Sequence, residues 1–112
     1  MPDYAVGVAP RAERRLKKLP RAEQRKVAKV LLELTMNPRP RGVEKLAENP
    51  AFWRIRAGNY RVIYHIDDKK KFVAVADIRD RKDVYRNLSA LDPAVIVNSI
   101  KEVMDRGRQS SK

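Results

Sequence analysis

The clearest hydrophobic–polar pattern in the chain lies in residues 52–86, FWRIRAGNYRVIYHIDDKKKFVAVADIRDRKDVYR. Hydrophobic and polar residues alternate there over three short runs, and turn-forming residues separate the runs at Gly58-Asn59 and at residues 67–70. A β-strand sends successive side chains to opposite faces of its sheet, so a period of two is typical of a half-buried strand. The segment therefore predicts three strands in an antiparallel meander.

The alternation sorts the meander into an apolar face and an arginine face. The predicted apolar face carries Trp53, Ile55, Val62, Tyr64, Ile66, Phe72, Ala74, Ala76 and Ile78. The predicted arginine face carries Arg54, Arg56, Arg61, Arg79 and, if the last strand continues, Arg81. A guanidinium group presents a fork of N–H donors that matches the oxygens of a phosphate. Arginines that converge from three strands are therefore a candidate anion site.

The segments before the meander predict one strand and two helices. Alternation over residues 4–8 indicates a first strand, and Pro10 suits the first turn of a helix that Pro20 ends. Apolar residues at a helical spacing over residues 27–34 predict a second helix, which Asn37-Pro38 ends. The two helices form a helical hairpin with a strongly basic outer surface, and a linker over residues 38–50 leads to the meander.

A last helix is predicted after Asp92-Pro93, with Asp92 as the N-cap and Gly107 as the terminator. One face of this helix is apolar, and it consists of Ile96, Ile100, Val103 and Met104. Such a stripe has to bury against something, so the helix either closes over the sheet or leaves its groove to a partner helix. The fold class is α+β, an antiparallel-rich sheet packed on helices, with one domain over residues 1–91 and a C-terminal helix and frayed tail of the same domain over residues 92–112.

Charge points to the class of partner. The 112 residues include 26 Lys and Arg against 14 Asp and Glu, a net charge of +12. This excess favours a polyanion or an acidic protein as the partner, with RNA or DNA first. The chain has no cysteine and one histidine, which excludes disulfides and thiolate metal sites and argues against zinc. We expect no metal, no cofactor and no membrane segment, and a cytoplasmic location.

The string WRIRAGNYRVIYHI, the closing RKDVYR and the order of elements resemble the RelE toxins of the RelE/ParE toxin–antitoxin superfamily, over roughly residues 4–88. The resemblance implies a RelE/ParE-like fold with a microbial-RNase-like sheet packed on helices. It implies a toxin that cuts messenger RNA on the ribosome without a metal and so inhibits translation. It also implies a cognate acidic, RelB-like antitoxin, and contact with operator DNA only through the antitoxin complex.

The resemblance also implies which residues act. The family's catalytic positions match Arg54, Arg56, Arg61, Arg81 and Tyr85, with Arg79 as the alternative to Arg81. We weigh base stacking and packing equally for Tyr85. The expected RNA- and ribosome-binding residues are Arg14, Lys17, Lys18, Arg25, Lys45 and Lys82, for which a plain solvated surface is the alternative. Trp53, Tyr60, Tyr64 and Phe72 are expected in the core.

One departure from the family concerns the proton acceptor. Some members have lysines where this chain has Arg54 and Arg56, and those lysines are proposed to help remove the proton of the ribose 2′-hydroxyl. Arginine is effectively never deprotonated, so here it can clamp the phosphate but cannot act as a base. Proton removal is then left to ribosomal groups or water. His65 is a tempting substitute, but a structural or solvent-facing role is favoured over a titrating one.

Two other functions stay open. The first is a non-enzymatic ParE-type inhibitor of DNA gyrase, which shares the fold and the basic surface, but ParE-type members generally lack the arginine cluster and Tyr85. The second is a catalytically weak relative that serves as a binding partner in an antitoxin complex. The arginine face itself has two plainer interpretations, as solvated charge or as an antitoxin-binding surface only.

Overall fold

The computed structural model describes residues 3–83 and 87–110. Its elements, in chain order, are β1 (Ala5–Val8), α1 (Pro10–Lys18), α2 (Arg21–Met36), β2 (Glu44–Lys45), β3 (Trp53–Ala57), β4 (Tyr60–Asp67), β5 (Phe72–Asp80), the short 3₁₀ helix η1 (Leu88–Ala90) and α3 (Pro93–Ser110). The strands form one sheet in the order β1-β5-β4-β3-β2. β1 runs parallel to β5, and the other pairs are antiparallel. The predicted α+β class and the meander are confirmed.

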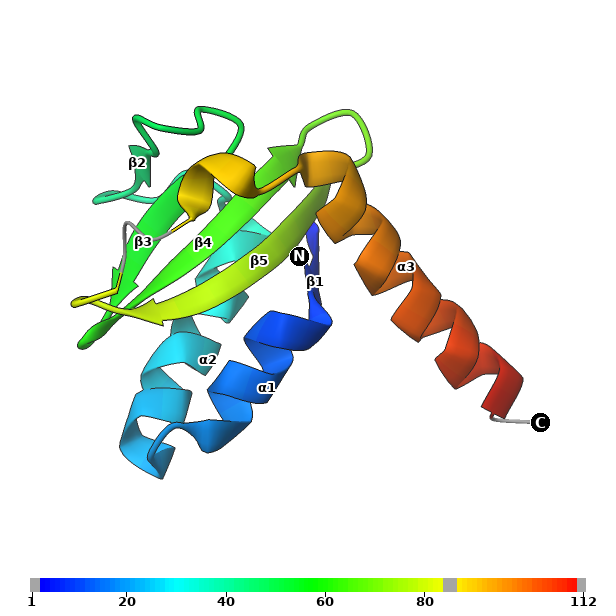
Figure 1. Ribbon diagram of the computed structural model, residues 1–112, viewed down its shortest axis with the longest axis horizontal. Helices are drawn as coiled ribbons and strands as arrows, with labels where there is room; N and C mark the ends of the chain where they lie inside the picture. The colour runs from blue at the N-terminus through cyan, green and yellow to red at the C-terminus, as the bar shows by residue number, and fades with distance from the viewer. Residues whose placement is uncertain (1–2, 84–86, 111–112) are drawn as a thin grey trace.

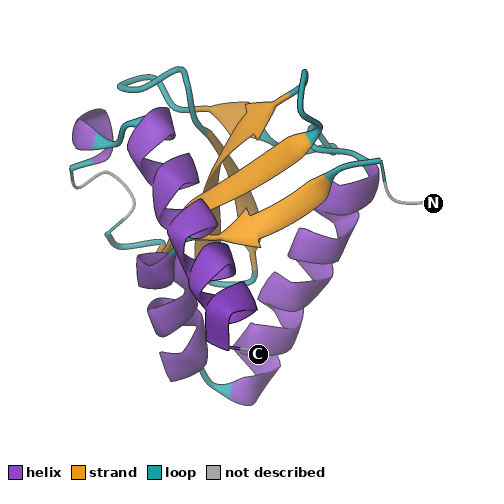
Figure 2. Ribbon diagram, turned by 90° about the vertical axis from the view of Figure 1, so that its right-hand side faces the viewer, coloured by secondary structure: helices purple, strands orange, loops and turns teal. Residues whose placement is uncertain are grey.

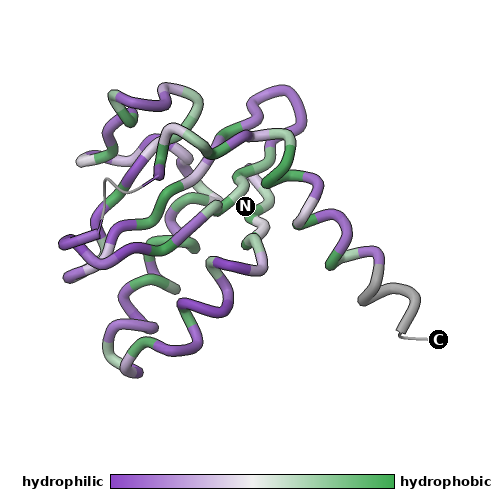
Figure 3. The backbone as a smooth tube through the Cα atoms, in the orientation of Figure 1, coloured by the Kyte–Doolittle hydropathy of each residue, from purple (hydrophilic) through white to green (hydrophobic). Residues whose placement is uncertain are grey.

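Helices cover both faces of the sheet (Figures 1 and 2). α1 and α2 pack on one face, where Val27 and Leu34 meet the fully buried Val62 and Tyr64 of β4. η1 and the first turns of α3 cover part of the opposite face. Hydrophobic residues are concentrated along the middle of the strands, and the ends of the meander at the β3–β4 turn are hydrophilic (Figure 3). The core therefore lies mainly between the sheet and the α1–α2 hairpin.

A β-bulge in β5 corrects the predicted faces of the meander. Ile63 pairs with Asp77 and Tyr64 pairs with Val75, so Ala76 is left without a partner on β4. An extra residue of this kind reverses the alternation of side chains beyond it. Ile78 lies in the core under α1 and α2 as predicted, but Phe72, Ala74 and Ala76 pack on the other face, beneath η1 and α3. Their assignment to one face with Ile78 was wrong.

Local sequence signals explain the two helices of the hairpin. Pro10 occupies the first turn of α1, where the missing N–H leaves no intrahelical bond unmade. Pro20 stands immediately before α2, and Asn37 follows it with extended backbone. These boundaries confirm the prediction. The linker over residues 38–50 contains one element that the sequence did not predict, the two-residue strand β2, in which Glu44 pairs with Arg54.

The C-terminal helix starts as predicted and ends later. The Asp92 carboxylate accepts a hydrogen bond of 2.9 Å from the Ala94 N–H, as an N-cap does. Gly107 does not end α3, which continues to Ser110. Ile100 is buried on Ala9 and Ala74, whereas the side chains of Val103 and Met104 are 42% and 52% exposed. Only the first half of the predicted stripe is covered, and the second half of α3 extends away from the body (Figure 1).

No helix in the described part of the chain is long and apolar enough to cross a lipid bilayer.

Gly7 of β1 allows α3 to approach the sheet. A Cβ atom at this position would lie 2.7 Å from both Ile100 Cγ2 and Phe72 Cζ. We expect Gly7→Ala to lower the free energy of unfolding by about 1–3 kcal/mol, because overfilling a packed site forces its neighbours to move. Urea denaturation measures this change. Ala5→Val, an exposed substitution on the same strand, is the control, and an equal effect of the two variants would contradict the close packing.

Candidate functional site

Strand register brings three arginines into a row. Arg56 on β3 pairs with Arg61 on β4, which pairs in turn with Arg79 on β5. Residues paired in this way share a face, with Cβ atoms ~5 Å apart. Arg54 lies on the same face, two residues before Arg56 on β3 and opposite Ile63. The sequence prediction that these four arginines share one face is confirmed.

Three of these arginines line a small pocket with a carboxylate. The pocket has a volume of about 180 Å³ and is lined by Gly42, Glu44, Arg54, Arg56 and Arg61. The Arg54 guanidinium donates a hydrogen bond of 2.7 Å to Glu44 Oε2, and Arg56 Nε donates one of 3.0 Å to the Gly58 carbonyl. Among the described residues, no hydrogen bond or ion pair engages the Arg61 guanidinium. We call this group the arginine pocket.

Glu44 was missed by the sequence analysis, and it is the carboxylate of the arginine pocket. The hydrogen bond from Arg54, and then the positive charges of Arg54 and Arg61, hold the pKa of Glu44 below its usual value. The side chain remains 63% exposed, so a ligand can reach it. A period-two search could not find it, because β2 has only two residues.

Arg79 differs from the other arginines of the row because it is buried. Its side chain is 6% exposed, and its Nε lies 2.8 Å from Oδ2 of the fully buried Asp77. Arg15 of α1 pairs with the other oxygen of the same carboxylate at 3.3 Å. The row therefore has an exposed end at Arg56 and a fixed, ion-paired end at Arg79.

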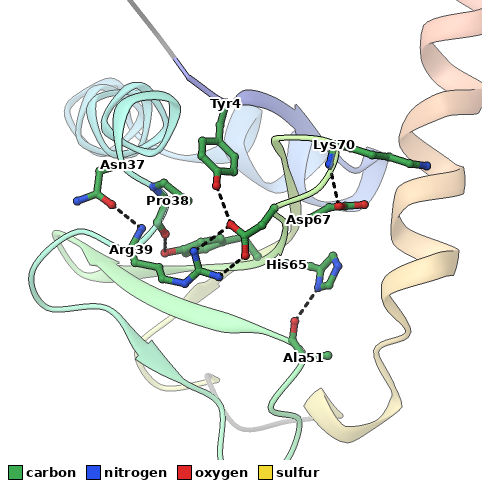
Figure 4. Close-up of polar contacts among 10 residues, drawn as sticks. Tyr4, Asn37, Pro38, Arg39, Ala51, His65, Asp67 and Lys70 are labelled. Carbon is green, nitrogen blue, oxygen red and sulfur yellow. Dashed lines mark hydrogen bonds and ion pairs between the residues drawn. The ribbon is translucent and has the colours of Figure 1, made fainter.

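Arg81 is the remaining predicted catalytic residue that the structure describes, and it does not line the pocket. Arg81 follows the end of β5 and is exposed, and its backbone N–H donates a hydrogen bond of 3.1 Å to the Asn59 carbonyl. Tyr85 lies outside the described residues. His65 Nδ1 lies 2.8 Å from the Ala51 carbonyl oxygen, so this nitrogen carries the proton (Figure 4). His65 is four residues from Arg61 on β4, about 13 Å along a strand, so it is remote from the arginine pocket.

Three of the six predicted RNA- and ribosome-binding residues lie together on α1, and the other three lie on other segments of the chain. Arg14 lines a groove between α1 and α3, and Arg25 lines a separate depression beside Leu16. Lys45 Nζ lies 5.2 Å from the centroid of the Trp53 ring. The other three of these side chains, Lys17, Lys18 and Lys82, are exposed. The described structure therefore offers several basic surfaces besides the arginine pocket.

Comparison with known proteins identifies the family. The family model described as the ParE toxin of the type II toxin–antitoxin system parDE matches residues 6–85. The chain belongs to the RelE/ParE superfamily of type II toxins. No curated protein sequence matched it.

Solved structures of RelE toxins share the fold of this RelE/ParE toxin. RelE of the RelE–RelB complex from Pyrococcus horikoshii is 30% identical, with a TM-score of 0.64 over 70% of this chain and 96% of that one. The RelBE2 toxin–antitoxin complex of Mycobacterium tuberculosis is 29% identical, with a TM-score of 0.63 over 72% and 100% of the two chains. The isolated Escherichia coli RelE toxin is 28% identical, with a TM-score of 0.60 over 73% and 90%.

An ion-pair network fixes the linker that brings Glu44 to the toxin's arginine pocket. Arg39, at the start of this linker, donates hydrogen bonds of 3.1 and 2.8 Å to the two carboxylate oxygens of Asp68, and Tyr4 donates one of 2.6 Å (Figure 4). The Arg39 guanidinium also lies 5.2 Å from the centroid of the Trp53 ring. The buried Tyr64 hydroxyl donates to the Pro38 carbonyl at 2.7 Å. The linker is thus tied to both β3 and β4.

The Asp68 carboxylate makes the stability of this toxin depend on pH. Hydrogen bonds from Arg39 and Tyr4 lower the pKa of Asp68 to about 2. When folding lowers the pKa of a carboxyl group, the charged group stabilises the folded state at every pH above its pKa in the unfolded chain. This stabilisation is lost as the pH falls through the pKa of the group in the folded protein. We expect Asp68→Asn to lower the melting temperature at neutral pH, and the difference from the parent protein to shrink below about pH 4 and to vanish below about pH 2.

Melting curves of the two proteins across this pH range check the prediction. Asp105→Asn, which changes an exposed aspartate on α3, is the matched control and should lower the melting temperature little at any pH. A difference between the parent protein and Asp68→Asn that is independent of pH would show that the network does not act through the charge of Asp68.

Proposed function

We propose that this toxin is a ribosome-dependent endoribonuclease that cuts messenger RNA and so stops translation. The observation that supports the proposal is the arginine pocket, in which Arg54, Arg56 and Arg61 surround an exposed carboxylate. Guanidinium groups match the oxygens of a phosphodiester, and a nearby carboxylate can accept a proton. Together they supply a phosphate clamp and a proton acceptor, which are two of the groups that cleavage of RNA by its 2′-hydroxyl uses.

In the proposed reaction the ribose 2′-oxygen attacks the adjacent phosphorus, and the bond from phosphorus to the 5′-oxygen of the next nucleotide breaks. The products are a 2′,3′-cyclic phosphate and a 5′-hydroxyl. Arg56 and Arg61 hold the non-bridging oxygens and stabilise the negative charge that develops there. The proton of the 2′-hydroxyl passes to a base, and the leaving 5′-oxygen takes a proton from water. No metal takes part in these steps.

Glu44 is the proposed base. Arg54, Arg56 and Arg61 cannot release a proton at physiological pH, so the phosphate clamp and the proton acceptor have to be different groups. Glu44 Oε2 accepts a hydrogen bond of 2.7 Å from the Arg54 guanidinium, and Glu44 lines the same pocket as the three arginines, so a phosphate bound there would lie beside this carboxylate. The pKa of Glu44 is held below its usual value, so the carboxylate is ionised at physiological pH and has the lone pair that a base needs.

The proposed partners follow from the charge and from the relatives. With a net charge of +12, the toxin is attracted to ribosomal and messenger RNA in the cytoplasm. Its relatives include toxins in complex with RelB antitoxins, and we propose an acidic antitoxin of the same kind for this chain. Operator DNA would be reached only through that complex. A gyrase inhibitor of the ParE type is the competing function, and it needs no phosphate clamp beside a base.

Arg61→Ala tests the clamp. We expect cleavage to fall by about 10²–10³-fold, as when one donor to a developing anion is removed. The melting temperature should change little, because Arg61 has no ion pair among the described residues to lose. The measurement is cell-free translation followed by mapping of the 5′ ends of the message. Arg21→Ala, at an exposed arginine of α2, is the matched control and should cut at the parent rate.

Codon-phased cuts that depend on Arg61 support an endoribonuclease. Intact message together with trapped gyrase–DNA complexes would replace the proposal by gyrase inhibition. A message cut at the parent rate by a folded Arg61→Ala protein would remove the phosphate clamp from the mechanism.

Glu44→Gln tests the base. General base catalysis contributes about 10²–10⁴-fold, so we expect a loss of cleavage of this size with ribosome binding kept. Glu48→Gln, at an exposed glutamate of the same linker, is the control and should be fully active. Cleavage by Glu44→Gln at the parent rate would assign proton removal to the ribosome or to water.

A further inference from the structure

Two arginines of α1 lie beside the buried end of the arginine row. β1 ends at Val8, which pairs with Val75, so α1 rather than a strand flanks the rest of β5. Arg11 and Arg15 are four residues apart on α1 and therefore lie on one side of the helix. Sequence analysis selected Arg14, Lys17 and Lys18 from this helix, but none of them lines the space in front of Arg79.

Asp77 fixes the arginines at this end. Its carboxylate is fully buried, and it accepts hydrogen bonds from Arg79 Nε at 2.8 Å and from the Ile78 N–H at 2.8 Å. Arg15 Nε lies 3.3 Å from Oδ1 of the same Asp77 carboxylate. A buried carboxylate needs such partners, because an isolated charge away from water is very costly. The same contacts hold guanidinium groups from two different elements in one place.

A second pocket opens over this network. It has a volume of about 410 Å³ and is lined by Arg11, Arg15, Arg79, Asp83 and Asn87. Its three arginines outnumber Asp83 and the underlying Asp77, so the pocket keeps a positive charge. Arg79 is opposite Arg61, which lines the arginine pocket. The two pockets are therefore neighbours on one face of the sheet, with β3 and β5 ~10 Å apart.

We propose that this second pocket binds a further backbone phosphate of the same RNA strand whose phosphate lies in the arginine pocket. The choice of RNA as the ligand rests on the proposed function. Arg11 and Arg15 are the phosphate-binding residues, and Asp77 is a positioning residue that acts through Arg15 and Arg79. Pockets joined by a row of arginines at regular strand spacing suit a polymer with regularly repeated charges, and an RNA backbone is such a polymer.

Binding of a non-cleavable RNA tests this site without using catalysis. The probe is a short single-stranded RNA with 2′-O-methyl groups, whose affinity is measured by fluorescence anisotropy over a range of salt concentrations. Each phosphate neutralised in a single strand contributes about −0.7 to the slope of log K against log salt. We expect Arg15→Gln to make the slope shallower by about 0.7, and Arg15→Lys to restore the slope with weaker binding, because lysine keeps the charge but loses the fork.

The matched control is Arg21→Gln, which removes an exposed arginine of α2 outside the pocket. The side chain of Arg15 is 47% exposed and the Asp77–Arg79 pair stays in place without it, so Arg15→Gln should fold, as its melting temperature will show. A slope that is unchanged in Arg15→Gln, or changed equally in Arg21→Gln, would overturn the site. Binding of polyglutamate that depends on Arg15, with no such dependence for RNA, would overturn it in favour of an acidic protein segment.

The outcomes separate this site from the proposed function. A shallower slope in Arg15→Gln, with no cut message in translation, supports the phosphate site and rejects the endoribonuclease. Cuts that depend on Arg61, with no effect of Arg15 on the slope, reject the phosphate site and leave the endoribonuclease in place.

Discussion

The register of β3, β4 and β5 is the constraint on which the site depends. It sets three like charges opposite one another in the row Arg56, Arg61 and Arg79, and like charges placed in this way destabilise a sheet. A shift of the register by one residue would relieve the repulsion, but it would move the side chains of the shifted strand to the opposite face of the sheet. Val62 and Tyr64 would leave the core under α1 and α2 and arginines would enter it. Burial of the opposite face thus keeps the arginines together.

Two carboxylates, those of Glu44 and Asp77, reduce the repulsion among the positive charges of the row. Glu44 of β2 pairs with Arg54 and lines the arginine pocket beside Arg56 and Arg61, and Asp77 within β5 pairs with Arg79 at the other end of the row. Each also orients an arginine, so the groups that would stabilise a developing negative charge are in place before a ligand binds. Preorganised charges of this kind need little rearrangement during a reaction, which is the main source of electrostatic catalysis.

The sequence alone predicted the parts of the fold that follow from local periodicity and from proline and glycine. Arg54, Arg56 and Arg61 were placed on the correct face because β3 and β4 are regular up to that point. The bulge at Ala76 left no local signal, since alanine fits either face of a strand. β2 is too short to show a period, so Glu44 was missed.

Tertiary contacts account for the remaining differences. The contact between Arg15 and Asp77 joins residues 62 positions apart through the packing of α1 on β5, which no spacing rule predicts. The apolar stripe of α3 correctly indicated burial at Ile100, but the pattern could not show that the sheet ends before Val103. Periodicity therefore predicts which face of an element is apolar, and the extent of its neighbours decides how much of that face is covered.

The family resemblance implies lysine in some members at the positions of Arg54 and Arg56, and arginine at both positions changes which groups can carry out the steps of the proposed reaction. A lysine can in principle hold a phosphate and exchange a proton, whereas an arginine keeps its charge throughout. In the proposed reaction the proton acceptor must then be a separate group, and the pKa of Glu44, the proposed acceptor, is held below its usual value by Arg54 and Arg61. A bound phosphate offsets part of their positive charge, so the pKa of Glu44 rises when the substrate arrives. If Glu44 is the base of the proposed reaction, its strength as a base would therefore be greatest in the complex with the substrate.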